Sequence, residues 1–139
     1  MKVKEAMHKG AEWVTPDTPL REVARLMRHY DIGAIPVGTE DKIVGMITDR
    51  DIVCKAFAEE KFDVEKATAR DVMSKGIHTC REEDELEAAA HHMQELQVRR
   101  LPVIDRNKKM VGILSLGDLS HAAPPKVSVD CLKRVAAHH

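Results

Sequence analysis

Two hydrophobic stretches near the end of the chain show most clearly how it is organised. Residues 98–104 and 110–119 are apolar runs rich in β-branched side chains, and the polar, turn-forming segment 105–109 separates them. This pattern predicts a β-hairpin. The second run carries Gly112, Ser115 and Asp118 at three-residue spacing and then continues with a helical pattern. The segment therefore predicts two strands followed directly by a helix.

An earlier copy of the same pattern occupies residues 32–52. Met7, Leu20, Met27 and Pro36 lie 66 positions before Met73, Leu86, Met93 and Pro102, and Gly45, Thr48 and Asp51 lie 67 positions before Gly112, Ser115 and Asp118. The one-residue difference falls within the hairpin turn, where an insertion is tolerated. A repeat of this length is a supersecondary unit too small to bury its own apolar faces. The chain is therefore expected to be one pseudo-symmetric body built from two repeats.

Further elements follow from the spacing of apolar residues within each repeat. Short strands are predicted at 13–15 and 79–80, and amphipathic helices at 20–27 and 86–93, with Thr18 as N-cap and Pro19 at the first helical position of the earlier helix. Another helix is expected over 49–57. Each repeat reads β-α-β-β-α, which predicts an α+β fold whose repeats pack through their sheets. The predicted boundaries are 1–58 and 70–123 for the repeats, 59–69 for a connector and 124–139 for a tail.

The tail is expected to form a last helix that docks on the body or on a partner. Ser128 is its predicted cap, and Val129, Leu132 and Val135 give it an apolar stripe. The final residues, His138-His139, are native or a remnant of a purification tag.

Composition and charge limit the function classes. The 139 residues include 22 basic and 23 acidic side chains, for a net charge of −1, so no overall field attracts nucleic acid or an anionic membrane. The apolar runs are too short to span a bilayer, and the N-terminus lacks the hydrophobic region of a signal peptide. Three widely spaced cysteines do not make a disulfide framework. We therefore expect a cytoplasmic protein without nucleic-acid or membrane partners.

The two strand-to-helix junctions are the best candidates for chemistry. Thr48 with Asp51, and Ser115 with Asp118, each follow a glycine that allows close backbone approach. A hydroxyl and first-turn amides at such a junction can meet a phosphate, and the carboxylate can accept both hydroxyls of a ribose. The same spacing is also an ordinary capping box that binds nothing. Two copies at the same place in a repeat, one with Arg99 and Arg100 beside it, favour a binding site.

The doubled pattern, including residues 29–37 and 98–103, resembles a tandem cystathionine β-synthase (CBS) domain pair, or Bateman module, of the small stand-alone bacterial type. The resemblance covers residues 1–123. It implies a non-catalytic regulatory or energy-sensing module that binds AMP, ADP, ATP, NAD or S-adenosylmethionine in clefts between the repeats. It implies no obligatory cofactor, and an adenine nucleotide acts as the regulatory ligand.

Carried over position by position, the resemblance also implies two sets of binding residues. The main cleft takes Asp118 for the ribose, Ser115, Arg99 and Arg100 for phosphate, and Thr15 with the backbone near Ile35 for the base. The second cleft takes Thr48, Asp51, Cys80 and Leu101, with Arg50 as a substitute cation. Gly33 and Ala34 stand 66 positions before the two arginines. The second cleft therefore departs from the pattern and is expected to hold phosphate more weakly.

Other candidate sites have weaker patterns. The pairs His91-His92 and His78 with Cys80 suggest metal ligands, but adjacent helical histidines point in different directions and no second pair has finger spacing. Cys54 and Cys131 are more typical of small apolar residues than of redox centres. No nucleophile–base pair accompanies Asp49 and Asp51, and the repeats use all of the sequence, so neither catalysis nor metal binding is expected.

Two function classes stay open from the residues alone. One is a nucleotide-sensing module, and the other is a ligand-free protein-interaction module whose clefts are vestigial. We also expect a homodimer formed through helical faces that include Met27, Ala90, Met93 and the helices at 49–57 and 118–123. The regulated protein is unknown.

Overall fold

The computed structural model describes residues 1–10, 12–39 and 42–137, and it forms two compact units. Unit 1 comprises Met1–Ala11 and His78–His139, and unit 2 comprises Glu12–Ile77. The tip of the first hairpin at 40–41 and the terminal residues 138–139 lie outside the described residues.

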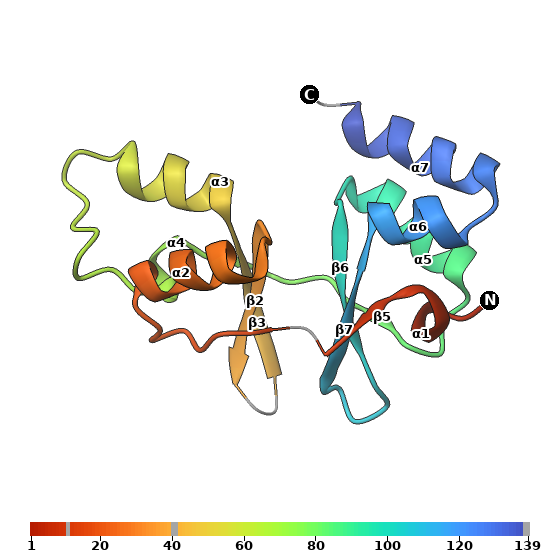
Figure 1. Ribbon diagram of the computed structural model, residues 1–139, viewed down its shortest axis with the longest axis horizontal. Helices are drawn as coiled ribbons and strands as arrows, with labels where there is room; N and C mark the ends of the chain where they lie inside the picture. The colour runs from red at the N-terminus through yellow and green to blue at the C-terminus, as the bar shows by residue number, and fades with distance from the viewer. Residues whose placement is uncertain (11, 40–41, 138–139) are drawn as a thin grey trace. The chain divides into compact units, whose positions relative to one another are not determined.

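Unit 1 holds a four-stranded sheet in the order β1-β7-β6-β5. Its elements are α1 (Val3–Ala6), β1 (His8–Lys9), β5 (Cys80–Arg81), α5 (Leu86–Leu96), β6 (Arg100–Ile104), β7 (Met110–Ser115), α6 (Leu116–Ala122) and α7 (Pro125–Ala136). The β6–β7 hairpin is antiparallel, whereas β5 runs parallel to β6. Figure 1 shows α7 running along α5 and α6, with which it is in contact.

Unit 2 holds a three-stranded antiparallel sheet in the order β2-β3-β4. Its elements are α2 (Leu20–Tyr30), β2 (Ala34–Thr39), β3 (Lys42–Thr48), α3 (Asp49–Asp51), the π-helix η1 (Ile52–Phe57), α4 (Ala69–Val72) and β4 (Ser74–Lys75). The strand predicted at 13–15 is reduced to one parallel bridge between Val14 and Val37. The α+β class and the hairpin-then-helix order predicted from the sequence are confirmed.

Strand pairing places the leading segment of each repeat in the unit that holds the hairpin of the other repeat. β1, from the start of the chain, pairs with β7 of the second repeat, and β4, which follows the connector, pairs with β3 of the first. The connector is not a loose linker, because Ala67 and Ala69 are buried in the core of unit 2. The boundaries predicted for the two repeats follow the sequence pattern. The compact units are divided differently, because hydrogen-bonded strands exchange the leading segments of the repeats.

Two glycines make this pairing possible. A Cβ at Gly45 would lie 2.7 Å from the carbonyl oxygen of Ser74, and one at Gly112 would overlap the carbonyl oxygen of His8. Only glycine lets the backbones approach this closely. The glycine positions read from the repeat therefore fix where β4 and β1 lie in the two sheets.

Each unit has an aliphatic core of its own. In unit 2 the core includes Leu20, Ile35 and Ile47, and in unit 1 it includes Leu101 and Leu114. Burial of such side chains is worth about 1.5–3 kcal/mol each.

The predicted tail helix forms and docks on unit 1. Cys131 and Val135 on α7 are buried, while Val129 and Leu132 are about half exposed. The Ser128 hydroxyl donates to the Leu119 carbonyl oxygen at 2.7 Å and does not cap the helix, which begins at Pro125.

The start of α2 differs from its prediction. Pro19 is the N-cap and Leu20 the first helical residue, because Pro19 has an extended backbone with φ −55° and ψ 140°. The hydroxyl of Thr18 accepts a hydrogen bond from the backbone N–H of Thr15 at 3.1 Å.

The expectation that Met27, Ala90 and Met93 contribute to a dimer surface is wrong. Their exposed fractions are 8%, 0% and 0%, and all three belong to the cores of their units. Ala90 is covered within the chain itself, because its carbonyl oxygen accepts the Cys131 thiol from α7 at 3.7 Å.

Candidate functional site

The junction between β7 and α6 holds its predicted residues together in a reciprocal cap. The Ser115 hydroxyl accepts the backbone N–H of Asp118 at 3.1 Å, and Oδ2 of Asp118 accepts the backbone N–H of Ser115 at 2.9 Å. Asp118 is only 9% exposed and is the one charged side chain that is buried among the described residues. A buried carboxylate needs partners that compensate its charge. The cap supplies one of them.

The second partner of Asp118 comes from the start of the chain. Nδ1 of His8 lies 3.1 Å from Oδ1 of Asp118, and the imidazole is 86% exposed. β1 carries His8 to this position by pairing His8 with Ile113 of β7. Both oxygens of this carboxylate are therefore engaged, one by the cap and the other by an exposed side chain.

Arg99 and Arg100 lie next to the same junction. Arg100 is the cross-strand partner of Ser115 in the β6–β7 hairpin, so the two side chains project from the same face of the sheet. The carbonyl oxygen of Arg99 accepts the N–H of Leu116 at 2.9 Å, which ties the first residue of α6 to β6. Both arginines are exposed. The junction thus combines a hydroxyl, a carboxylate and the guanidinium of Arg100.

The junction between β3 and α3 in unit 2 has the same cap. The Thr48 hydroxyl accepts the N–H of Asp51 at 3.1 Å, and Oδ2 of Asp51 accepts the N–H of Thr48 at 3.0 Å. Here the other carboxylate oxygen meets a lysine, because Nζ of Lys55 lies 3.1 Å from Oδ1 of Asp51. The lysine is four residues further along the continuous helix formed by α3 and η1.

Charge around the unit 2 junction differs from charge around the unit 1 junction. The cross-strand partner of Thr48 is Ala34, where unit 1 has Arg100. A Cβ at Gly33 would lie 2.8 Å from the carboxylate of Asp49, so that carboxylate fills the space which a side chain at this position needs. Arg50 is exposed, and its N–H donates to Oδ1 of Asp49 at 2.8 Å. The position across the hairpin from the cap hydroxyl therefore carries a guanidinium in unit 1 and no charge in unit 2.

The remaining predicted residues lie within the units as follows. Thr15, in unit 2, is exposed, and its hydroxyl lies 3.0 Å from that of Thr18. Ile35 is fully buried in the same unit. In unit 1 the side chains of Cys80 and Leu101 are buried in the core, so these two residues present only backbone atoms to a ligand. The joining of residues from both units in one cleft stays a prediction.

His8 and Lys55 are the two junction residues that sequence reasoning missed. The i, i+4 spacing of Asp51 and Lys55 on a predicted helix is a signal that points to their ion pair. His8 lies 110 positions before Asp118 and has no local signal. Only the pairing of β1 with β7 brings it there.

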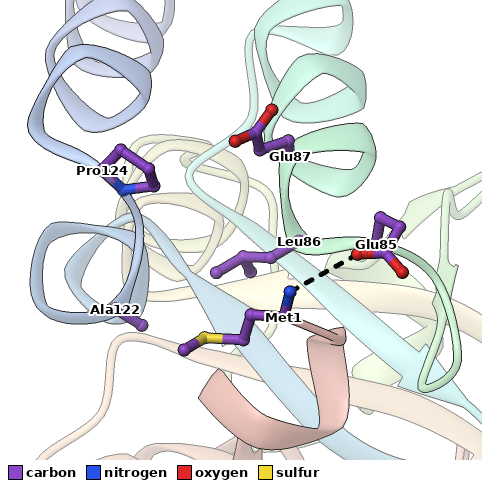
Figure 2. Close-up of a pocket in the computed structure, with 6 residues that line it drawn as sticks. All are labelled: Met1, Glu85, Leu86, Glu87, Ala122 and Pro124. Atoms are coloured by element: carbon purple, nitrogen blue, oxygen red, sulfur yellow. Dashed lines mark hydrogen bonds and ion pairs between the residues drawn. The ribbon is translucent and has the colours of Figure 1, made fainter.

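A pocket of about 530 Å³ lies elsewhere in unit 1, near the start of α5 and the end of α6. It is lined by Met1, Glu85, Leu86, Glu87, Ala122 and Pro124. The terminal ammonium lies 3.5 Å from Oε2 of Glu85, and Figure 2 shows the Met1 side chain extending toward Ala122. None of the predicted site residues lines this pocket.

Candidate metal ligands do not assemble. The described ranges 1–10, 12–39 and 42–137 contain no group of three or more histidine, cysteine or acidic side chains placed to hold a metal ion. The rings of His78 and His92 meet edge to face, with centroids 6.2 Å apart. Burial raises the pKa of the Cys80 thiol to about 12. In the part of the chain that the structure covers, no helix is both long and apolar enough to cross a bilayer.

Comparison with known proteins adds an independent line of evidence. The CBS domain family model matches residues 3–56 and 69–124. Hypoxic response protein 1 of Mycobacterium tuberculosis is 33% identical over 135 residues, which cover 96% of this chain and 93% of the relative. A crystal structure of Hypoxic Response Protein I with two coordinated zinc ions superposes with a TM-score of 0.79 at 34% identity, covering 89% of this chain and all of that one.

Two further solved structures contain adenosine compounds. The structure of CBSX2 in complex with AMP has a TM-score of 0.75 and 27% identity, over 88% of this chain and 95% of that one. The CBS domain pair of protein MJ0100, in complex with methylthioadenosine and S-adenosyl-L-methionine, has a TM-score of 0.76 and 27% identity, over 87% of this chain and 94% of that one. The doubled fold, its two capped junctions and these matches together show that the chain belongs to the CBS domain family and carries two CBS repeats.

Proposed function

We propose that the protein is a non-catalytic regulatory module that binds an adenosine-containing ligand, with the ribose at Asp118 and the phosphate near Ser115 and Arg100. The observation that carries the proposal is the cross-strand pairing of Arg100 with Ser115. A cap needs only the hydroxyl and the carboxylate, and it gives no reason for a guanidinium on the same face. Relatives of this fold that contain AMP or S-adenosylmethionine support the choice of ligand class.

One observation favours the alternative of a ligand-free interaction module. Both carboxylates already have both oxygens engaged, by a cap and by a basic side chain. Capping and charge compensation alone account for them. In the nucleotide-binding function, the ribose replaces His8 at Oδ1 of Asp118.

Titration calorimetry with AMP on the wild type and on Asp118→Asn separates the two functions. Asparagine keeps the size of the side chain and an oxygen for the Ser115 N–H, but it removes the charge. Each bond from a ribose hydroxyl to the carboxylate is worth about 1.5–3 kcal/mol, so we expect a ten- to hundredfold loss of AMP affinity.

The matched control for this titration is Asp105→Asn. Asp105 accepts two backbone N–H groups in the β6–β7 turn, at 2.8 and 3.0 Å, so it is also a structural carboxylate of unit 1. We expect the control to leave AMP affinity unchanged. Absence of AMP, ATP, NAD and S-adenosylmethionine binding to the wild type, or equal affinities in both variants, would contradict the nucleotide-binding function.

We also propose that the protein forms a homodimer through exposed apolar side chains of its helices. Val53 and Phe57 lie one turn apart on η1 and are 59% and 68% exposed. Large apolar side chains gathered on one surface are typical of contact sites. Light scattering at micromolar concentration is expected to give the mass of two chains, and Phe57→Ser is expected to weaken the dimer. A monomeric wild type would exclude this assembly.

A further inference from the structure

The two carboxylates of the caps have different basic partners, and these come from different places in the two repeats. Asp118 contacts His8 of β1, whereas Asp51 contacts Lys55 of η1. Ser74 stands in unit 2 at the position that His8 has in unit 1, and Ala122 stands in unit 1 at the position that Lys55 has in unit 2. Each unit therefore places one basic side chain on its carboxylate, and the two side chains come from different positions of the repeat.

The two partners are held very differently. Nζ of Lys55 lies 3.1 Å from Oδ1 of Asp51, and it also donates to the carbonyl oxygen of Val72 at 3.2 Å and to the hydroxyl of Ser74 at 3.4 Å. An ammonium has three N–H donors, so these three acceptors use all of them. They also join η1 to α4 and β4.

His8 is restrained much less. Its ring is 86% exposed, and β1 is only two residues long. β7, with which β1 pairs, has no ionisable side chain over Met110–Ser115. The imidazole itself can therefore move into water at little cost, and the ligand hydroxyls then take its place at Oδ1 of the buried Asp118 carboxylate.

Each carboxylate oxygen has about two lone pairs, and the backbone N–H of the cap uses one of those on Oδ2 in both units, so a diol that binds through two hydroxyls also needs Oδ1. At Asp118 the diol replaces an exposed imidazole. At Asp51 it must separate a charge-assisted pair whose lysine is fixed by two further acceptors, which is a larger cost. The two repeats therefore differ in how readily their carboxylates accept a ribose.

We propose that Lys55 is a specificity-determining residue, which keeps the Asp51 carboxylate occupied and confines adenosine-type ligands to the Asp118 junction. This inference rests on the proposed function. It is independent of the phosphate-binding arginines, because it concerns the ribose alone.

The test uses adenosine, which has no phosphate, and counts binding sites by titration calorimetry. The wild-type chain is expected to bind one adenosine. In Lys55→Met the freed carboxylate accepts the diol, so a second site is expected, with affinity raised roughly ten- to a hundredfold over the wild-type Asp51 junction. The double variant Lys55→Met/Asp51→Asn is expected to return to one site. Lys66→Met, at another exposed lysine of unit 2, serves as the control and is expected to keep one site.

A reciprocal variant tests the same inference without relying on the stability of Lys55→Met. His8→Ser/Ala122→Lys transfers the arrangement of unit 2 to unit 1, and it is expected to lose at least tenfold in adenosine affinity at Asp118. Thermal melting shows whether each variant is folded. A single site in folded Lys55→Met, or two equal sites in the wild type, overturns this inference while leaving the proposed function intact. A wild type that binds none of the adenosine compounds overturns both.

Discussion

The docking of α7 on unit 1 can be tested by comparing the same substitution at a buried and at an exposed position of this helix. Val135 is 1% exposed and packs in the core of unit 1, whereas Val129 on the same helix is 47% exposed. Val135→Ala and Val129→Ala make the same chemical change and gain the same helix propensity, about 0.5 kcal/mol. The difference between their unfolding free energies therefore reports burial alone.

The magnitude follows from the groups removed. Each buried methyl or methylene is worth about 0.8 kcal/mol, so Val135→Ala loses about 1.6 kcal/mol of transfer free energy. The cavity left in the core of unit 1 adds roughly another 1 kcal/mol. After the propensity gain, Val135→Ala is expected to lower the unfolding free energy by about 2 kcal/mol. Val129→Ala is expected to change it by less than about 0.5 kcal/mol.

Urea unfolding followed by circular dichroism measures both variants. If the slope of the unfolding free energy against urea concentration is the same as in the wild type, the substitution has changed only the stability. In thermal melts, about 2 kcal/mol corresponds to a midpoint lower by roughly 6–10 °C. Measurement at two protein concentrations separates folding from association, because an interface contribution grows with concentration. Equal losses in the two variants, or a larger loss for Val129→Ala, would refute the docking face assigned to α7.

Three further predictions concern cysteines, phosphate binding and pH. Cys54 is exposed, whereas burial raises the pKa of the Cys80 thiol to about 12 and also raises the pKa of the Cys131 thiol. A thiol reagent is therefore expected to modify only Cys54 in the native protein and all three cysteines in urea. Fast labelling of Cys80 in the native protein would contradict its place in the core. Arg99→Ala/Arg100→Ala is expected to weaken AMP more than adenosine, by a factor that shrinks with added salt; equal weakening in calorimetry would exclude a phosphate contact. Hydrogen bonds from Lys4 and then Lys2 lower the pKa of Glu83, so this exposed group stabilises unit 1 above the ordinary glutamate pKa and loses that contribution as pH falls through its lowered value. NMR titration of Glu83 is expected to show a midpoint that moves up in Lys4→Met, and an unchanged midpoint would show that the pair does not form in solution.

The sequence by itself determined the repeat, the hairpins and the two capped junctions. These features depend on local rules: β-branched runs separated by a polar turn, helical spacing of apolar residues, and a hydroxyl three positions before a carboxylate. The reciprocal caps at Ser115 and at Thr48 formed as predicted, because all of their atoms lie within four residues of one another. The glycines at 45 and 112 likewise indicated where another backbone comes close.

Only the tertiary structure decided which segments complete each unit and which side chains reach the carboxylates. β1 and β4 are two residues long, too short for periodicity to reveal their partners, and their pairing follows from space left by glycine and from core packing. The same pairing brings His8 to Asp118 across 110 positions. Burial also depends on the whole fold: Ala90 and Met93 were expected at a dimer surface, but both are buried in the core of unit 1. Local sequence thus specified the caps and the i, i+4 pair of Asp51 with Lys55, whereas long-range strand pairing brought His8 to Asp118.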